Sequence, residues 1–141
     1  MKKISIVTSC FNEEDNITLL YKKLKDIIEK LNSRYNFEII FIDNASTDFT
    51  QDELRKIANE DKNVKLILNS RNFGSIKSPY YAICQATGDA IIYLASDLQD
   101  PPELIYEFIE NWEKGCEVVI ARKYDSQKFK FLEVLRKFYY Y

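Results

Sequence analysis

The chain of 141 residues contains no histidine. Histidine is the commonest general base of enzymes and the usual zinc and haem ligand, so other residue types must fill such roles here. Cysteine is also scarce, since Cys10, Cys84 and Cys116 lie far apart and form no CxxC pair. An odd number of widely spaced thiols predicts reduced cysteines in the cytosol rather than a disulfide framework.

Glycine and proline number three each, so no Gly- or Pro-rich linker divides the chain, and its length suits one domain with a real core. No apolar run reaches the ~20 residues of a membrane span. The run after Met1-Lys2-Lys3 is too short for a signal peptide. A net charge of -2 gives no sign of nucleic-acid binding. These absences predict a cytoplasmic protein that binds no nucleic acid.

Short β-prone runs alternate with amphipathic segments along the chain. Strands are predicted at residues 4–7, 37–42, 64–68, 90–94 and 117–120. Helices are predicted at residues 17–31, from 54 onward, at 78–86 with Pro79 in the first turn, and from Asp100 to a C-cap at Gly115. This alternation predicts an α/β fold with a mostly parallel, right-handed doubly wound sheet.

The stretch from Ile91 to Glu103 is the one around which the rest of the chain is organised. An apolar run stops at Ala95, polar residues follow at once, and Pro101-Pro102 opens a new element. Open α/β sheets bind ligands at the carboxyl ends of their strands. Asp97 and Gln99 sit one residue apart in this loop, so they can present two oxygens to one Mg²⁺ or Mn²⁺ beside a substrate phosphate.

Four loops that follow predicted strands carry a resemblance to a known family. The loops are Ser9–Glu14, Asp43–Asp48, Arg71–Gly74 and Ser96–Glu103. Together they resemble family 2 glycosyltransferases of the GT-A fold, a three-layer α/β/α architecture. The string Asp-Leu-Gln-Asp-Pro-Pro-Glu is similar to the subgroup that makes polyprenyl-phosphate sugars, such as dolichol-phosphate mannose synthases. The resemblance covers nearly all of the chain through Arg122.

The resemblance implies a role for each matching residue. Asp97 and Gln99 would hold Mg²⁺ or Mn²⁺ on the diphosphate, and Asp97 and Arg122 would be the catalytic residues, with Arg122 near the donor diphosphate or acceptor phosphate. The nucleotide sugar would be bound by Cys10, Phe11, Asn12, Glu13, Asp43, Asn44, Arg71, Gly74, Ser96 and Asp97. The implied enzyme is an inverting glycosyltransferase that moves a sugar from a UDP- or GDP-sugar to a polyprenyl phosphate for cell-envelope glycan synthesis.

Three features depart from the family pattern. Ala95 stands where relatives usually have an aspartate, so one carboxylate near the metal is absent. Asn44 replaces the second acid of the usual pair at positions 43 and 44. Relatives also run well beyond residue 141 and carry the rest of the acceptor site there. The lack of histidine agrees with a phosphate acceptor, which is largely ionised at neutral pH with a second pKa of ~6; an aspartate base for a hydroxyl acceptor stays open.

The chain divides at residue 123 into a predicted nucleotide-sugar-binding domain, 1–123, and a basic, aromatic segment, 124–141. Apolar residues of the segment recur at helical spacing among lysines and arginines, a pattern typical of an interfacial amphipathic helix. Residues 128–141 are therefore expected to touch a membrane, with the protein at its cytoplasmic face. Core packing or contact between copies in a homo-oligomer would also explain the aromatic residues.

Other functions and simpler roles stay open. The acceptor could be a hydroxyl of a surface polysaccharide, or the chain could bind nucleotide sugar with little turnover, or it could be a plain α/β interaction domain. Asp97 could be a turn residue, Asp43 an Asx-turn and Arg71 a surface ion-pair partner. Asp100 is explained by helix capping. Cys10 is expected to pack rather than react, because no histidine can activate it.

Overall fold

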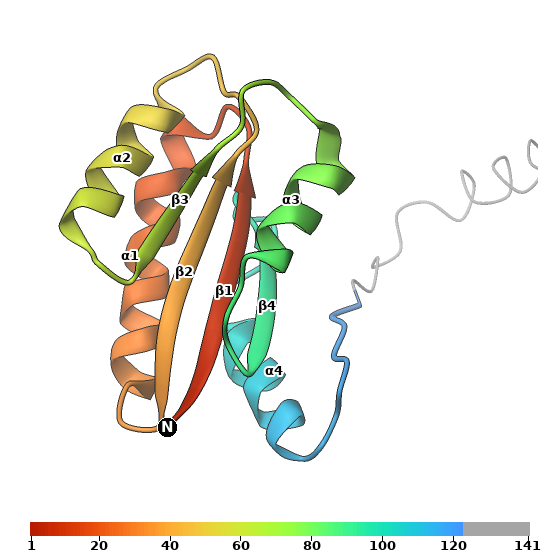
Figure 1. Cartoon of the computed structure of the whole chain (residues 1–141). Coiled ribbons are helices and arrows are strands. Elements are labelled where there is room, and N and C mark those ends of the chain that lie inside the picture. The colour runs from red at the N-terminus through yellow and green to blue at the C-terminus, as the bar shows by residue number, and fades with distance from the viewer. Residues whose placement is uncertain (123–141) are drawn as a thin grey trace, which may run out of the picture.

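The computed structural model describes residues 1–122, which form a single parallel sheet covered by helices on both faces (Figure 1). The strands are β1 Lys2–Cys10, β2 Tyr35–Asp43, β3 Val64–Leu68 and β4 Ala90–Ala95. The helices are α1 Glu14–Leu31, α2 Thr50–Glu60, α3 Gly74–Cys84 and α4 Leu104–Glu113. The sheet order is β3-β2-β1-β4, and every neighbouring pair is parallel. The predicted α/β class is confirmed.

The two faces of the sheet have different partners because side chains alternate along each strand. Ile6, Ile39 and Ile92 stand side by side in register and point to the larger core, which α1, α2 and α4 cover. Val7 and Ile40 point to the other face, where α3 packs through Ala82. The three layers that this creates place α3 alone on its face (Figure 1).

A buried carboxylate ties together the amino-terminal half of the sheet. Glu38 on β2 lies within 2.9 Å of Lys3 Nζ and 2.7 Å of Lys65 Nζ, from the strands on either side. Its other oxygen accepts hydrogen bonds from Ser5 Oγ at 2.6 Å and from Thr87 N at 2.8 Å. Both oxygens of the buried Glu38 carboxylate therefore have partners, which is what makes a buried charge tolerable.

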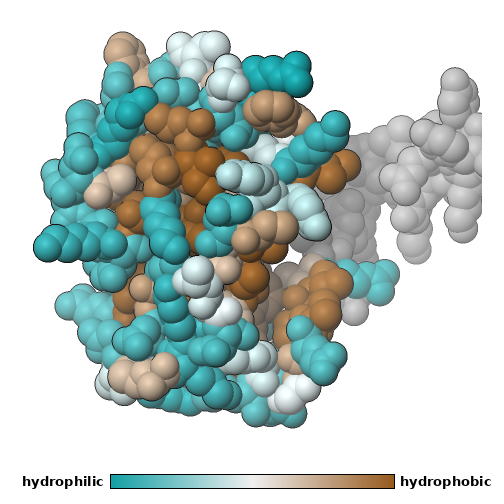
Figure 2. All heavy atoms as spheres, in the orientation of Figure 1, coloured by the Kyte–Doolittle hydropathy of each residue, from teal (hydrophilic) through white to brown (hydrophobic). Residues whose placement is uncertain are grey.

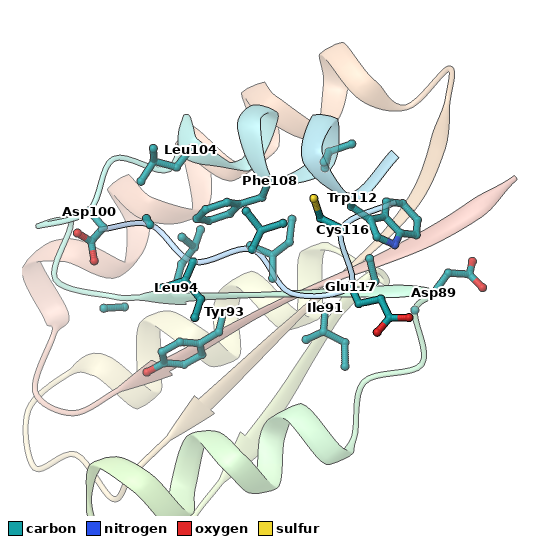
Figure 3. Close-up of a pocket in the computed structure, with 18 residues that line it drawn as sticks. Asp89, Ile91, Tyr93, Leu94, Asp100, Leu104, Phe108, Trp112, Cys116 and Glu117 are labelled. Atoms are coloured by element: carbon teal, nitrogen blue, oxygen red, sulfur yellow. The ribbon is translucent and has the colours of Figure 1, made fainter. Parts of the chain in front are cut away.

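The predicted fifth strand at residues 117–120 is wrong. The segment after α4 is extended but pairs with no strand among residues 1–122, and Val118 and Ile120 are 78% and 82% exposed. A strand forms only where a neighbour takes its backbone hydrogen bonds. Here a hollow of about 700 Å³ lies between β4 and this segment, so the two backbones do not meet (Figure 3).

All four helix starts also differ from prediction. α1 begins at Glu14 rather than Ile17, and α2 begins at Thr50 rather than Leu54. α3 begins at Gly74, so Pro79 lies inside the helix rather than in its first turn. The side chain of Asn72 accepts a hydrogen bond from Gly74 N at 2.8 Å, and Gly74 has a φ of +85° that favours glycine. α4 begins at Leu104, with Glu103 rather than Asp100 at its N-cap. Its C-cap is Lys114, one residue before the predicted Gly115, which follows with a φ of +97°.

Over residues 1–122, every helix is too short or too polar to cross a membrane. The predicted domain boundary after residue 123 and the amphipathic segment 124–141 lie outside the described residues.

Candidate functional site

A pocket of about 390 Å³ opens where the carboxyl ends of β1, β2 and β4 meet the start of α3. Parallel strands bring their following loops to one edge of the sheet, which is why loops far apart in sequence converge here. The lining residues are Ser9, Cys10, Phe11, Glu13, Asn44, Asn72, Gly74, Ser75, Ser78, Pro79, Ala95, Ser96 and Asp97. The structure therefore joins residues from all four loops predicted to bind, along with the beginning of α3.

Asn12 fastens the loop after β1 to the loop after β2. Its backbone N donates to Ser46 Oγ at 2.9 Å, and its side-chain oxygen accepts from Thr47 N at 2.9 Å. One residue on, Glu13 N donates to Thr50 Oγ1 at 2.7 Å. Asn12 thus orients the loop that places Phe11 and Glu13 on the pocket wall, while its own amide is occupied by the neighbouring loop.

Asp48 continues this contact between the two loops. Its carboxylate accepts hydrogen bonds from Glu14 N at 3.2 Å and from Thr50 N at 3.0 Å. Burial alone would raise the pKa of Asp48, but hydrogen bonds from Thr50 and from the backbone outweigh burial and lower that pKa below its ordinary value. Asp48 is therefore ionised at neutral pH and holds the start of α1 against the start of α2.

Asp43 is the last residue of β2 and is fully buried. Its Oδ2 accepts from Ser46 N at 3.0 Å and from Gln51 Nε2 at 2.7 Å. The bond to Ser46 closes a turn one residue longer than the Asx-turn that stayed open as an alternative role. Its Oδ1 is buried and meets no hydrogen-bond donor within residues 1–122. An unpaired buried carboxylate oxygen is costly, so one at the functional edge of a sheet calls for an explanation.

Asn44 organises the wall that α3 contributes. Its Nδ2 donates to Asn72 Oδ1 at 2.8 Å, and its Oδ1 accepts from Phe73 N at 2.9 Å and from Asn69 Nδ2 at 3.1 Å. Asn72 Oδ1 in turn accepts a hydrogen bond from Gly74 N, which fixes the first turn of α3. The amide at position 44 therefore serves as both donor and acceptor, a combination that an ionised aspartate lacks.

The loop after β4 brings Ser96 and Asp97 to the pocket. Ser96 Oγ donates to the backbone oxygen of Ser9 at 2.9 Å, which joins this loop to β1. Asp97 Oδ1 accepts from Gln99 N at 3.1 Å, so Asp97 also forms a local turn. Ala95, at the position where an acid was expected, lines the pocket with a methyl group.

The loops around the pocket hold all the non-glycine residues with positive φ in residues 1–122. They are Asn12 at +56°, Ala45 at +63° and Leu98 at +56°, one in each of the loops after β1, β2 and β4. Alanine and leucine adopt this conformation at a cost of about 1–2 kcal/mol each. The sequence pattern did not predict this strain. The strained residues cluster where the loops pass close to one another.

Five predicted site residues lie outside the lining: Asn12 and Asp43, described above, and Arg71, Gln99 and Arg122. Arg71 is exposed and stacks its guanidinium 4.9 Å from the ring centre of Phe73. Gln99 and Arg122 are likewise absent from the set of lining residues. Cys10 lines the pocket with a buried thiol, and burial raises its pKa far above the ordinary value, which agrees with a packing role. Ser9 and Asn72 lie in predicted loops but were given no role of their own, and Ser75, Ser78 and Pro79 lie outside those loops.

The charge of the lining is one-sided. Among the described residues that line the pocket, Glu13 and Asp97 are the charged ones, and neither lysine nor arginine occurs. No cluster of three or more acidic, histidine or cysteine side chains that could enclose a metal occurs in residues 1–122. Protein oxygens alone would therefore supply only part of a metal's coordination here, as is usual for Mg²⁺ held beside substrate phosphates.

The larger hollow, beside β4, has a different character (Figure 3). Leu94, Leu104 and Phe108 give it an apolar wall, while Asp89 and Glu117 lie toward one end and Asp100 toward the other. None of the residues predicted to bind or react lies in this hollow. The predicted residues that line a cavity therefore all line the smaller, polar pocket.

Comparisons with known proteins agree with this arrangement. The sequence model of the family described as Glycosyl transferase family 2 matches residues 5–140. The chain is 41% identical over 123 residues to a prophage bactoprenol glucosyl transferase homolog of Escherichia coli (strain K12), which covers 87% of this chain and 40% of the relative. It is also 41% identical over 117 residues to an uncharacterized glycosyltransferase, YkcC, of Bacillus subtilis (strain 168), covering 83% of this chain and 36% of that protein.

Solved structures share the fold. S. aureus TarS (residues 1–349) matches with a TM-score of 0.65 at 24% identity, over 91% of this chain and 40% of that one. Glucosyl-3-phosphoglycerate synthase of Mycobacterium tuberculosis, solved with Mn²⁺, UDP and phosphoglyceric acid, matches with a TM-score of 0.58 at 24% identity, over 82% of this chain and 40% of that one. The chain thus spans about 40% of the length of these relatives. With a family match over nearly its whole length, the chain belongs to glycosyl transferase family 2.

Proposed function

We propose that this chain is the donor-binding part of a glycosyltransferase that takes a sugar from a nucleoside diphosphate sugar and passes it to a polyprenyl phosphate. The observation that carries the proposal is the polar pocket at the carboxyl end of the sheet, with Glu13 and Asp97 as its charged walls. Family membership over residues 5–140 supports the reaction class. The names of the bactoprenol glucosyl transferase relatives support the acceptor class.

The charge of the lining supports binding of the donor with a divalent cation. A diphosphate is strongly anionic, and a pocket walled by two carboxylates and no cationic side chain would repel it. The residues fit Mg²⁺ or Mn²⁺, because Asp97 and the nearby Gln99 offer hard oxygen ligands. When bound, such an ion neutralises charge on the leaving diphosphate and orients it. Ala95 leaves the chain with one carboxylate fewer for this task than family members usually have.

The chain's own residues would bind and orient the nucleotide. Asp43 is buried next to the lining residue Asn44 and is not itself a lining residue. Its Oδ1 would accept an N–H or O–H donor from the base or ribose, which would remove its unpaired state. Phe11 offers an exposed ring on the pocket wall for contact with the nucleoside, and the amide network of Asn44 keeps the start of α3 in position. Ser96 and Gly74 complete the wall around the sugar and diphosphate.

The acceptor side of the proposal rests on fewer residues. Arg122, at the end of the described segment, would stabilise negative charge on the phosphates, and Arg71 would do so from the rim of α3. A lipid phosphate needs no base to activate it, which suits a chain without histidine. We place the protein at the cytoplasmic face of a membrane, where residues 128–141 would make peripheral contact.

Calorimetric titration of the purified chain with UDP and GDP tests the donor site. We expect binding in the presence of Mn²⁺ or Mg²⁺, loss of binding in EDTA, and a preference that names the base. Asp97→Ala should abolish the metal-dependent part, whereas Asp61→Ala, on the far side of α2, should not change it. The proposal fails if neither nucleotide binds with metal present.

A second candidate function, nucleotide-sugar binding with little turnover, is favoured by Ala95 in the pocket lining. Incubation of the chain with the preferred sugar nucleotide, metal and undecaprenyl phosphate separates the two. Lipid-linked sugar as product supports the transferase, and tight donor binding without product supports the binding function.

A further inference from the structure

The exposed face of α3 differs in composition from the rest of the protein surface. The chain has 22 acidic residues, yet none falls between residues 63 and 88, a stretch that includes all of α3. The charges in that stretch are Lys65, Arg71 and Lys77, all positive. A helix that a protein merely exposes to water usually carries charges of both signs on its outer side.

The side chains of α3 separate cleanly into an inner and an outer set. Ser78, Pro79 and Ala82 are buried against β1 and β2. Ile76, Tyr80 and Tyr81 point outward and are 81%, 68% and 52% exposed. At the helical period of 3.6 residues, the outer residues fall on one side of the helix. We call this side the α3 patch: Phe73, Ile76, Lys77, Tyr80, Tyr81 and Cys84.

Other exposed apolar residues on the helices have acidic neighbours, unlike those of the α3 patch. Phe49 is 70% exposed at the start of α2 but stands among Asp48, Asp52 and Glu53. Single exposed apolar residues of that kind are normal. In Figure 2 the outer side of α1 and α2 is mostly hydrophilic, while the most hydrophobic residues gather over the sheet between α2 and α3 and on the segment after α4.

The apolar surface continues from α3 onto the sheet. β4 lies next to β1, and its Ile91 and Tyr93 point to the same face as Val7, which α3 covers. Both are more than two-fifths exposed, at 44% and 42%. At its other end the α3 patch reaches the polar pocket, since Gly74, Ser75 and Ser78 of the same helix line it. A partner that lies against α3 therefore reaches the rim of the pocket.

We propose that the α3 patch is the surface through which the protein lies on an anionic lipid bilayer. Tyrosine and isoleucine side chains enter the boundary between headgroups and acyl chains, and Lys77 and Arg71 pair with anionic headgroups. The absence of acidic residues from 63 to 88 removes repulsion from that surface. The inference deepens the proposed function and rests on it. A bilayer against the α3 patch would bring a lipid phosphate to the edge of the donor pocket.

The three cysteines allow a direct test with the full chain. Cys84 lies on the α3 patch, Cys116 is exposed after α4, and Cys10 is buried and resists labelling. An environment-sensitive maleimide fluorophore is attached at Cys84 in a Cys116→Ser variant and at Cys116 in a Cys84→Ser variant. On addition of vesicles of equal parts phosphatidylcholine and phosphatidylglycerol, we expect a blue shift with increased emission at Cys84 and little change at Cys116. Equal responses, or a response at Cys116 alone, would overturn the proposal.

Substitutions on the α3 patch test the same surface without a label. In vesicle co-sedimentation, Tyr80→Ser and Ile76→Ser should each weaken partitioning about tenfold, since each removes apolar area from the interface. Lys77→Gln should weaken it about fivefold, an effect that high salt removes. Phe49→Ser is the matched control and should leave partitioning unchanged. Partitioning that stays unchanged in all three α3 variants would leave membrane contact to another segment, such as residues 128–141, and overturn the inference.

A second copy of the chain is the competing occupant of this surface. Sedimentation velocity without lipid distinguishes it, because a dimer that Tyr80→Ser dissociates would show that the α3 patch is a protein interface. UDP and GDP titrations on the same variants keep the two proposals apart. Nucleotide binding should be retained in Tyr80→Ser and Ile76→Ser, which lie outside the pocket lining. Loss of vesicle binding with retained nucleotide binding supports the bilayer surface on its own.

Discussion

Strand β2 carries two buried carboxylates five positions apart, and they differ in how many hydrogen-bond and ion-pair partners they have. Glu38, in the amino-terminal half of the sheet, is paired with Lys3 and Lys65 and receives hydrogen bonds from Ser5 and Thr87. Asp43, at the carboxyl end, forms no ion pair within residues 1–122 and keeps one oxygen without a donor. The difference teaches that one end of the sheet is satisfied by the fold itself, while the other is left ready for a ligand.

Backbone conformation separates the two ends in the same way. The non-glycine residues with positive φ in residues 1–122 all follow carboxyl ends of strands, and none lies in the turns at the amino ends. Strain of this kind persists only where surrounding contacts enforce it, and it concentrates at sites of function. Hydrogen bonds between the loops after β1 and β2 supply that enforcement around the pocket.

Removing the charge of Glu38 should have the largest effect on stability. Glu38→Gln leaves two lysines without their carboxylate, and because both lysines are partly exposed we expect a loss of about 2–3 kcal/mol in the free energy of unfolding. Urea denaturation measures it. The matched control is Glu53→Gln, which breaks a solvent-facing pair with Lys56 and should leave stability nearly unchanged.

The same variant should alter the pH dependence of stability. Burial alone would raise the pKa of Glu38, but hydrogen bonds from its two lysines, Ser5 and Thr87 hold that pKa well below its ordinary value. Because the folded pKa is depressed, the unfolded chain binds the proton first, and the stabilisation is complete above the unfolded pKa of ~4.3 and lost as pH falls below it. Glu38→Gln should flatten this acid limb; an unchanged limb would contradict the assignment.

Asp43→Asn is the corresponding change at the ligand end. Asparagine can still accept from Ser46 N and Gln51 through its oxygen, so the free energy of unfolding should change by less than about 1 kcal/mol. Nucleotide affinity should fall about tenfold to a hundredfold, because an NH₂ group would replace the oxygen that accepts the donor of the nucleoside. Calorimetry with the preferred nucleotide and Mn²⁺ measures this loss. A large loss of stability with unchanged affinity would show that Asp43, like Glu38, serves the fold.

The sequence was sufficient to predict the four observed strands and the edge of the sheet where the polar loops meet. Apolar runs at 4–7, 37–42, 64–68 and 90–94 all lie within observed strands, since a parallel sheet buried on both faces requires them. The fifth run, 117–120, has the same local composition but no neighbouring strand in residues 1–122. Local pattern therefore predicts the capacity to form a strand, and pairing decides whether one forms.

Site residues were predicted where they belong to a recognisable sequence motif. They were missed where contacts between residues far apart in the sequence bring them to the site. Asp97 and Glu13 were expected and do line the pocket. Asn72 was missed because its importance comes from Asn44, 28 positions away, and from the helix start that both create. Gln99, predicted as a metal ligand, lies outside the lining, so its role stays a prediction. The pairing of Glu38 with Lys65 was hidden for the same reason, because it joins separate strands.

The smallest expected effect tests the strain itself. Ala45 holds a φ of +63° in the loop after β2 with a side chain that does not compensate for it. Ala45→Gly relieves the left-handed conformation, worth about 1–2 kcal/mol, but adds flexibility to the unfolded chain, worth about 0.5–1 kcal/mol. The free energy of unfolding should therefore rise by about 0.5–1 kcal/mol. Ala86→Gly, after α3 and with an ordinary φ, should lower it instead.

If Ala45→Gly also weakens nucleotide binding, the strained conformation keeps the pocket in its binding shape. If binding is unchanged, the contacts of Asn12, Ser46 and Thr47 are sufficient to fix the loop.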